Sequence, residues 1–196
     1  MLFGALLVAG CGGSKSSTPS TKVPPRSSPT TTTTSSGVPA LQAEAQSAAT
    51  GDIPDNQVFL RYRSPAGWSI KYPEGWARTS VTGGVVFRDK NNIVRVVVQS
   101  GARPTAKSVT ASLSALAGAQ AQGAPQPIRL PSGPAVKAQY RTQSPPSSVT
   151  GKRVTLAVDR YEVGSGGRLA VIDLGTPVGV DNVDAYRLIS QSFRWR

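Results

Sequence analysis

Residues 58–76 decide the fold and read VFLRYRSPAGWSIKYPEGW. Two runs within this stretch, residues 58–63 and 68–72, alternate apolar and polar side chains, as strands with one buried face do. The four residues SPAG separate the two runs, and proline and glycine are typical of a turn. The stretch therefore predicts a β-hairpin near the start of a folded domain.

Runs of the same kind continue along the chain. Further strands are predicted for residues 85–88, 93–99, 135–141, 153–163 and 168–174. Together with the two strands of the hairpin, the strands at 85–88 and 93–99 follow one another closely and suggest a meander of four strands. Residues 164–167 (GSGG) predict a tight hairpin between the last two strands.

Two segments have the spacing of helices instead. Within residues 105–121, Val109, Leu113 and Leu116 recur at i, i+4 and i+7, which is typical of an amphipathic helix. A second helix is expected from an N-cap at Asp181 to about Gln191. Hairpin strands with one central and one terminal helix predict an α+β fold, with an antiparallel β-sheet sandwiched with the two helices.

The N-terminus differs from the rest of the chain. An apolar run ends in Ala9, Gly10 and Cys11, the only cysteine, and resembles the lipobox of bacterial lipoproteins. The resemblance implies that residues 1–10 are a signal peptide, that Cys11 carries a diacylglycerol, and that the protein is extracytoplasmic and anchored to the cell membrane. The alternative is a small buried core thiol. Because no lysine or arginine precedes the run, we expect the true start to lie upstream of Met1.

Residues 11–50 predict a tether. From residue 12 to about residue 40 the composition is rich in serine, threonine, proline and glycine, and such a segment buries too little apolar surface to fold. We therefore expect a lipidated cysteine followed by a disordered linker, with the folded domain spanning residues 51–196.

Three short stretches resemble the PsbP-like fold. They are YRSPAGWSIKYPEGW at residues 62–76, VFRD at 86–89 and SQSFR at 190–194. This group includes the photosystem II protein PsbP, the Ran-binding Mog-type proteins and many bacterial lipoproteins. The resemblance implies an α+β domain in which Trp68 begins a strand and Phe193 packs the last helix. The histidines linked to metal binding in plant PsbP have no counterpart here, so we expect no metal site and no cofactor.

The amino-acid composition excludes several common catalytic mechanisms and one kind of metal site. The chain has no histidine, which removes Ser-His-Asp and Cys-His catalysis and histidine metal sites. The paired carboxylates Asp159 and Asp173 are the remaining acid-base candidates, but neighbouring arginines favour a solvated ion pair. We therefore expect a protein that is not an enzyme.

The charge points to anionic partners. Lysine and arginine number 22 against 10 acidic residues. Strand alternation predicts a candidate cationic patch of Arg61, Arg63, Arg95, Lys137 and Arg141. Its partners would be an anionic lipid, an anionic wall polymer or an acidic envelope protein, and not nucleic acid, because no basic-aromatic module is present. A plain solvated surface is the alternative.

These features lead to one functional expectation and two alternatives. The sequence favours a non-catalytic binding or scaffolding protein at the cell envelope. The first alternative is a carrier that captures a small ligand or lipid between sheet and helix, with Trp68, Tyr72 and Trp76 as candidate binding residues, although such aromatics more often serve packing. The second is an enzyme that uses surface carboxylates.

Overall fold

The computed structural model describes residues 51–147 and 150–196. The predicted signal peptide, Cys11 and the tether lie outside the described residues. The elements are β1 (Phe59–Ser64), β2 (Trp68–Pro73), β3 (Ala77–Val81), β4 (Gly84–Asp89), β5 (Asn92–Ser100), α2 (Ala106–Ser114), β6 (Gln120–Ala121), β7 (Gln126–Leu130), β8 (Gly133–Gln143), β9 (Thr155–Ser165), β10 (Arg168–Pro177), α3 (Val183–Ser192) and β11 (Arg194–Trp195).

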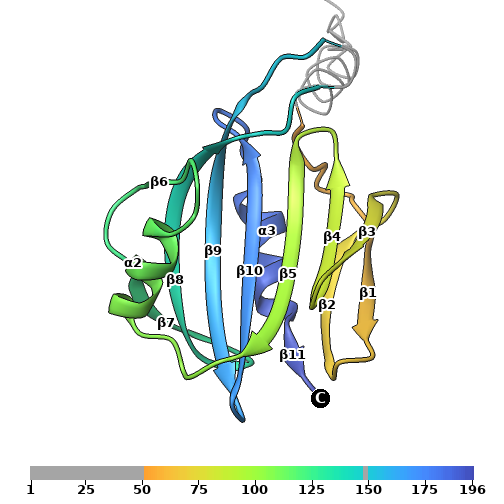
Figure 1. The fold of residues 1–196 in the computed structure, drawn as a ribbon. Coiled ribbons are helices and arrows are strands. Elements are labelled where there is room, and N and C mark those ends of the chain that lie inside the picture. Colours follow the sequence, from red (N-terminus) through yellow and green to blue (C-terminus); the bar gives the residue numbers. More distant parts are fainter. Residues whose placement is uncertain (1–50, 148–149) are drawn as a thin grey trace, which may run out of the picture. The chain divides into compact units, whose positions relative to one another are not determined.

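The strands form two antiparallel sheets (Figure 1). The small sheet has the order β1-β2-β11, and the main sheet has the order β3-β4-β5-β10-β9-β8-β6, with β7 also paired to β8. The predicted α+β class is confirmed. The predicted meander was wrong, because the β1–β2 hairpin and the β4–β5 hairpin belong to different sheets. The reason is burial: one face of β2 packs into the core that also holds β4 and β5.

The larger core cluster holds the small sheet and α3 against one face of the main sheet. Trp68 and Ile70 of β2, Phe87 of β4, and Ile189 and Phe193 from α3 and its end are all fully buried in it. As the resemblance implied, Trp68 begins β2 and Phe193 packs the end of α3. Large buried side chains therefore pack between this face of the main sheet, the small sheet and α3.

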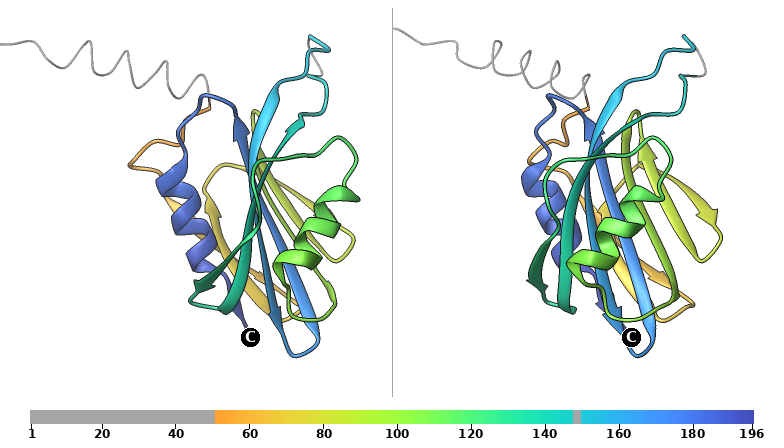
Figure 2. Two further views of the ribbon diagram at one scale, coloured as in Figure 1. Left: turned by 90° about the vertical axis from the view of Figure 1, so that its left-hand side faces the viewer. Right: turned by 60° about the vertical axis from the view of Figure 1, so that its left-hand side comes forward.

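A smaller core cluster lies under α2 on the other face of the main sheet (Figure 2). Val109 and Leu113 of α2 pack against side chains of β8 and β9. The prediction of a helix over residues 105–121 was too long, because α2 ends at Ser114 and β6 then pairs with β8. Gly118 has a φ of +73°, a left-handed conformation that favours glycine and turns the chain away from a helix.

A buried polar network ties the start of the domain to α3. The Asn182 side chain donates to Thr176 Oγ1 at 2.9 Å and to the Gly51 carbonyl at 3.2 Å, and its Oδ1 accepts from the Ile53 amide at 2.7 Å. The N-cap of α3 is Asn182, so the predicted N-cap Asp181 was wrong by one residue. The backbone decides the difference, because the carbonyl of Asn182 accepts the first hydrogen bond of the helix, from the Tyr186 amide at 2.9 Å.

Candidate functional site

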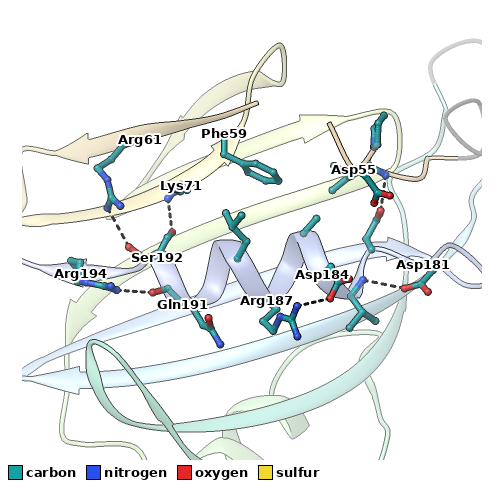
Figure 3. A pocket seen from close by; sticks show the side chains of 16 residues that line it. Asp55, Phe59, Arg61, Lys71, Asp181, Asp184, Arg187, Gln191, Ser192 and Arg194 are labelled. Carbon is teal, nitrogen blue, oxygen red and sulfur yellow. Dashed lines mark hydrogen bonds and ion pairs between the residues drawn. The ribbon is translucent and has the colours of Figure 1, made fainter. Parts of the chain in front are cut away.

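A groove of about 880 Å³ lies alongside α3 (Figure 3). We call it the α3 groove. The side chains that line it come from the segment before β1, from β1 and β2, and from the outer face and C-terminal end of α3. They include Ile53, Asp55, Phe59, Arg61, Lys71, Asp181, Asp184, Ala185, Arg187, Leu188, Gln191, Ser192 and Arg194.

One end of the groove is basic. Arg61 lies opposite Lys71 in the β1–β2 pairing, and Ser69 lies opposite both Arg63 and Arg194. Because successive side chains of a strand alternate, the register places Arg61, Arg63, Lys71 and Arg194 on one face of the small sheet. We call these four residues the basic face. Within residues 51–147 and 150–196, no carboxylate lies within ion-pair distance of any of them.

Two guanidiniums of the basic face also stabilise the end of α3. Arg61 Nη1 donates to the Ser192 carbonyl at 3.3 Å and to Ser69 Oγ at 3.2 Å. Arg194 Nη1 donates to the Gln191 carbonyl at 2.6 Å and to the Phe193 carbonyl at 2.7 Å. The C-terminus of a helix carries partial negative charge, so these contacts are favourable. A guanidinium has five N–H donors, so both arginines keep donors that can bind an anion.

The other end of the groove is acidic. Asp55, Asp181 and Asp184 lie near the N-terminal end of α3, where negative charge is favourable. Asp181 Oδ1 accepts from the Val183 amide at 3.2 Å, and Asp184 pairs with Arg187 at 2.8 Å. Apolar side chains such as those of Phe59 and Leu188 line the groove as well. The groove thus combines charges of opposite sign at its two ends with apolar surface.

The predicted aromatic residues lie elsewhere. Trp68 is fully buried in the larger core, Tyr72 stacks on Phe87 with ring centroids 4.0 Å apart, and Trp76 is buried beside them. None of the three lines the α3 groove. In this fold their side chains serve packing.

The predicted cationic residues do not form one surface. Arg61 and Arg63 lie on the small sheet, and the others lie on the main sheet. Arg95 is in register with Asp173, Arg160 and Ala138 across the main sheet, and Lys137 precedes Ala138. Side chains alternate along a strand, so Arg95 faces the opposite side of the sheet from Lys137 and Arg141.

The three cations of the main sheet also differ in their partners. Arg95 forms an ion pair with Asp173 at 3.1 Å, and Lys137 forms one with Asp159 at 2.8 Å. Burial lowers the pKa of Lys137, but the hydrogen bond and charge of Asp159 outweigh it, so its pKa is raised. Arg141 is exposed.

The candidate acid-base pair is separated. Asp159 lies opposite Leu174 and Asp173 lies opposite Arg160, so the two carboxylates face opposite sides of the sheet. Each is held by cations, but the pair of Asp173 with Arg160 is buried, where the sequence favoured a solvated pair. In the part of the chain that the structure describes, no cluster of histidine, cysteine or acidic side chains could hold a metal, and no helix has the length and apolarity to cross a membrane.

Sequence reasoning missed Lys71 and Arg194 as members of the basic face. A hairpin centred on SPAG places Lys71 opposite Arg61, so the sequence carried a signal for it. No comparable signal existed for Arg194, because the pairing of β11 with β2 joins distant parts of the chain.

Comparison with solved structures agrees with this arrangement of strands and helices. The chain is similar to cyanobacterial PsbP (CyanoP) from Synechocystis sp. PCC 6803, with a TM-score of 0.50 and 16% identity over 76% of this chain and 99% of that chain. The fold is PsbP-like. At this identity the likeness establishes the fold, and a shared fold does not carry function with it.

Two other solved structures match this PsbP-like domain with lower TM-scores. A protein from Bacteroides thetaiotaomicron VPI-5482 has a TM-score of 0.45 and 15% identity over 69% of this chain and 48% of its own. LpqN of Mycobacterium tuberculosis, which is involved in cell envelope biogenesis, has a TM-score of 0.40 and 19% identity over 71% of this chain and 90% of its own. No protein-family model and no curated protein matches the sequence.

Proposed function

We propose that this chain is a non-catalytic binding protein of the cell envelope, anchored on the outer side of the membrane by a diacylglycerol on Cys11. Its PsbP-like domain binds an acidic segment of another envelope protein in the α3 groove. The observation that carries this proposal is the basic face, whose four cations have no carboxylate partner among the described residues and three of which line the groove.

The shape and charge of the groove favour a protein segment over a membrane surface. Anionic lipid headgroups need only a flat basic patch. The α3 groove is instead a cavity that also offers an acidic end and apolar side chains such as Phe59 and Leu188. A peptide segment can match all three features, because its own side chains vary in sign and polarity along its length.

The charges of the basic face lie close to solvent, and this determines how salt affects binding in the groove. Solvent-exposed charges at an interface mainly raise the association rate and select the partner, and their contribution falls with salt. We therefore expect binding that weakens as ionic strength increases. Apolar contact at residues such as Phe59 would supply the part that salt does not remove.

The binding test uses the purified full chain and a fluorescein-labelled oligoglutamate peptide, with fluorescence anisotropy as the readout. The basic-face variant carries Arg61→Gln, Arg63→Gln and Lys71→Gln. The matched control removes the same charge at three exposed sites outside the groove, with Lys107→Gln, Arg129→Gln and Lys152→Gln. We expect the basic-face variant to lose at least tenfold in affinity and the control to retain most of it.

Three outcomes are decisive. Equal losses in both variants would mean that only net charge matters and would contradict the proposal. Binding to vesicles of phosphatidylglycerol, but not to the peptide, would assign the site to lipid instead. In cells, crosslinking of the tagged protein followed by mass spectrometry should recover a defined envelope protein that is lost in the Cys11→Ala variant.

A further inference from the structure

A second cavity lies on the other side of the main sheet from the core that holds α3. It has a volume of about 360 Å³ and is bounded by α2, by the loop before α2 and by β5, β9 and β10. In Figure 1, α2 lies at the β8 side of the sheet and leaves β10 and β5 uncovered. We call this space the α2 cavity. Its size lies at the lower end of the range for small-molecule sites.

Ionic side chains lie buried on the sheet face that floors the cavity. Arg160 Nε donates to Asp173 Oδ1 at 2.7 Å, and Arg160 Nη2 donates to Asp173 Oδ2 at 3.0 Å. Glu162 is also buried and accepts from Ser112 Oγ of α2 at 2.8 Å. Replacing a buried ion pair by well-packed apolar residues is often neutral or stabilising. The stability of the sheet therefore does not account for these charges.

The buried pair holds Arg95 in place at the cavity. Asp173 Oδ2 accepts from Arg95 Nη1 at 3.1 Å, so the carboxylate that Arg160 fixes also orients Arg95. The side chains of Arg160 and Asp173 are each 7% exposed, whereas that of Arg95 is 41% exposed. Arg95 therefore presents its remaining donors at the cavity in a fixed position, which lowers the entropy cost of binding an anion.

A second arginine reaches the cavity from the loop before α2. Arg103 is exposed, and its side chain makes no ion pair or hydrogen bond within residues 51–147 and 150–196. Asp173 and Glu162 balance two of the three guanidiniums at the site. One positive charge remains, which matches a ligand with a single negative charge.

Apolar side chains line much of the rest of the cavity, together with the polar side chains of Gln99, Ser108 and Ser112. Val97 of β5, Leu169 and Val171 of β10, and Leu116 after α2 line the cavity. Leu116 is 37% exposed although its position in the sequence predicted a packed helix face. Apolar surface of this kind next to a fixed guanidinium suits a molecule with an apolar body and a charged head.

We propose that the α2 cavity binds a small amphipathic carboxylate, with its head at Arg95 and Arg103 and its apolar body on Val97, Leu169, Val171 and Leu116. Arginine binds carboxylates through paired N–H donors, which gives both strength and orientation. This site is separate from the α3 groove and does not depend on the function proposed for that groove.

The test is isothermal titration calorimetry of the full chain with decanoate. Decanol and decyltrimethylammonium provide the same apolar body with a neutral or a cationic head, and acetate provides the head alone. We expect decanoate to bind at least tenfold more tightly than each of the three, because the site requires both the anion and the apolar body.

Variants locate the site. We expect Arg95→Gln and Arg103→Gln each to weaken decanoate binding about tenfold, and Ala102→Trp to block the cavity from the loop. The matched control is Arg88→Gln, because Arg88 is in register with Ile93 on the same face of the sheet but does not line the cavity. The Arg103 side chain makes no ion pair or hydrogen bond within the described residues, so Arg103→Gln keeps the test valid if Arg95→Gln is poorly folded.

The outcomes separate this site from the α3 groove. No heat with decanoate, equal affinity for decanol, or equal losses in Arg88→Gln and Arg103→Gln would overturn the proposal. The variant with Arg61→Gln, Arg63→Gln and Lys71→Gln should retain full decanoate affinity. A loss in that variant alone would also overturn the proposal, because it would place the ligand in the α3 groove.

Discussion

Arg160 and Asp173 form a two-point ion pair across neighbouring strands of the main sheet, with both side chains almost completely buried. Burial lowers the pKa of Arg160, but the hydrogen bonds and charge of Asp173 outweigh it, so its pKa is raised. The guanidinium of Arg160 therefore stays protonated at any ordinary pH. The effect of a mutation on the free energy of unfolding can be predicted from the energy needed to bury one charge without its partner.

Asp173→Asn should lower the free energy of unfolding by about 3–5 kcal/mol, because it leaves a buried guanidinium without its counter-charge. The double variant Arg160→Met and Asp173→Leu should recover most of that loss. Urea denaturation measures both. Asp184→Asn is the control, because its pair with Arg187 is exposed and should contribute less than about 1 kcal/mol. A loss for Asp173→Asn no larger than for Asp184→Asn would refute the prediction.

Stability should fall as the pH rises from about 10 to about 12. Burial raises the pKa of Tyr140 to about 12, and the charge of Asp173 adds to the effect. In this range the unfolded chain loses the tyrosine proton while the folded chain retains it, so unfolding releases a proton and becomes easier with rising pH. Below about pH 10 the residue is protonated in both states and contributes no pH dependence.

The variant Tyr140→Phe isolates this effect. Between about pH 9 and about pH 12, the free energy of unfolding of the variant should fall by about 2–3 kcal/mol less than that of the unmodified protein. Urea denaturation at several pH values measures the difference. Burial also raises the pKa of Tyr186, so some alkaline destabilisation should remain in the variant. Parallel stability curves for the two proteins would show that Tyr140 does not titrate in this way.

Asn182→Ala should release the start of the domain from α3. The variant removes the acceptor of the Ile53 amide and the donors to Thr176 and Gly51, at a cost of about 1–3 kcal/mol. Hydrogen exchange should show faster exchange of the Ile53 amide. Asn56→Ala, at an exposed position in the same segment, should leave that exchange rate unchanged. Unaltered protection of Ile53 in Asn182→Ala would argue against the network.

Gly84→Ala should disturb the β4–β5 hairpin. A Cβ at this position would overlap the backbone carbonyl of Val96 on the neighbouring strand, so the strands must move apart. We expect a loss of about 3 kcal/mol or more in thermal or urea unfolding. Gly123→Ala is the comparison, because no atom crowds its Cβ and only its φ of +84° carries a cost, about 1 kcal/mol. Similar losses at the two glycines would contradict the crowding argument.

Several strands were not predicted, because their residues lack the alternation or the length that is typical of a strand. β3 (ARTSV) is exposed along its whole length and has no alternation of apolar residues. β6 and β11 are each two residues long. Such strands form because a neighbouring strand already presents unpaired backbone groups, which is a property of the assembled sheet.

The candidate sites also contain some features that the local sequence predicts and others that depend on the assembled sheet. Arg61 and Arg63 were predicted to share a face because strand alternation requires it, and the register agrees. The separation of Arg95 from Lys137 and Arg141 depends on which strands become neighbours and in which register. The α2 cavity depends on where α2 ends, and the capping of Thr105 with Ser108 fixes only its beginning.

The resemblance to the PsbP-like fold implied the packing of Phe193 against the last helix. The sequence by itself determined the α+β class, the hairpin at residues 58–76 and the strand start at Trp68. These properties follow from local periodicity and turn residues, which act over a few positions of the chain. Tertiary structure alone decided that the strands divide into two sheets, that four cations form the basic face, and that Arg160, Asp173 and Arg95 meet at a cavity. Those features join residues distant in sequence, and only the packing of buried faces against one another brings them together.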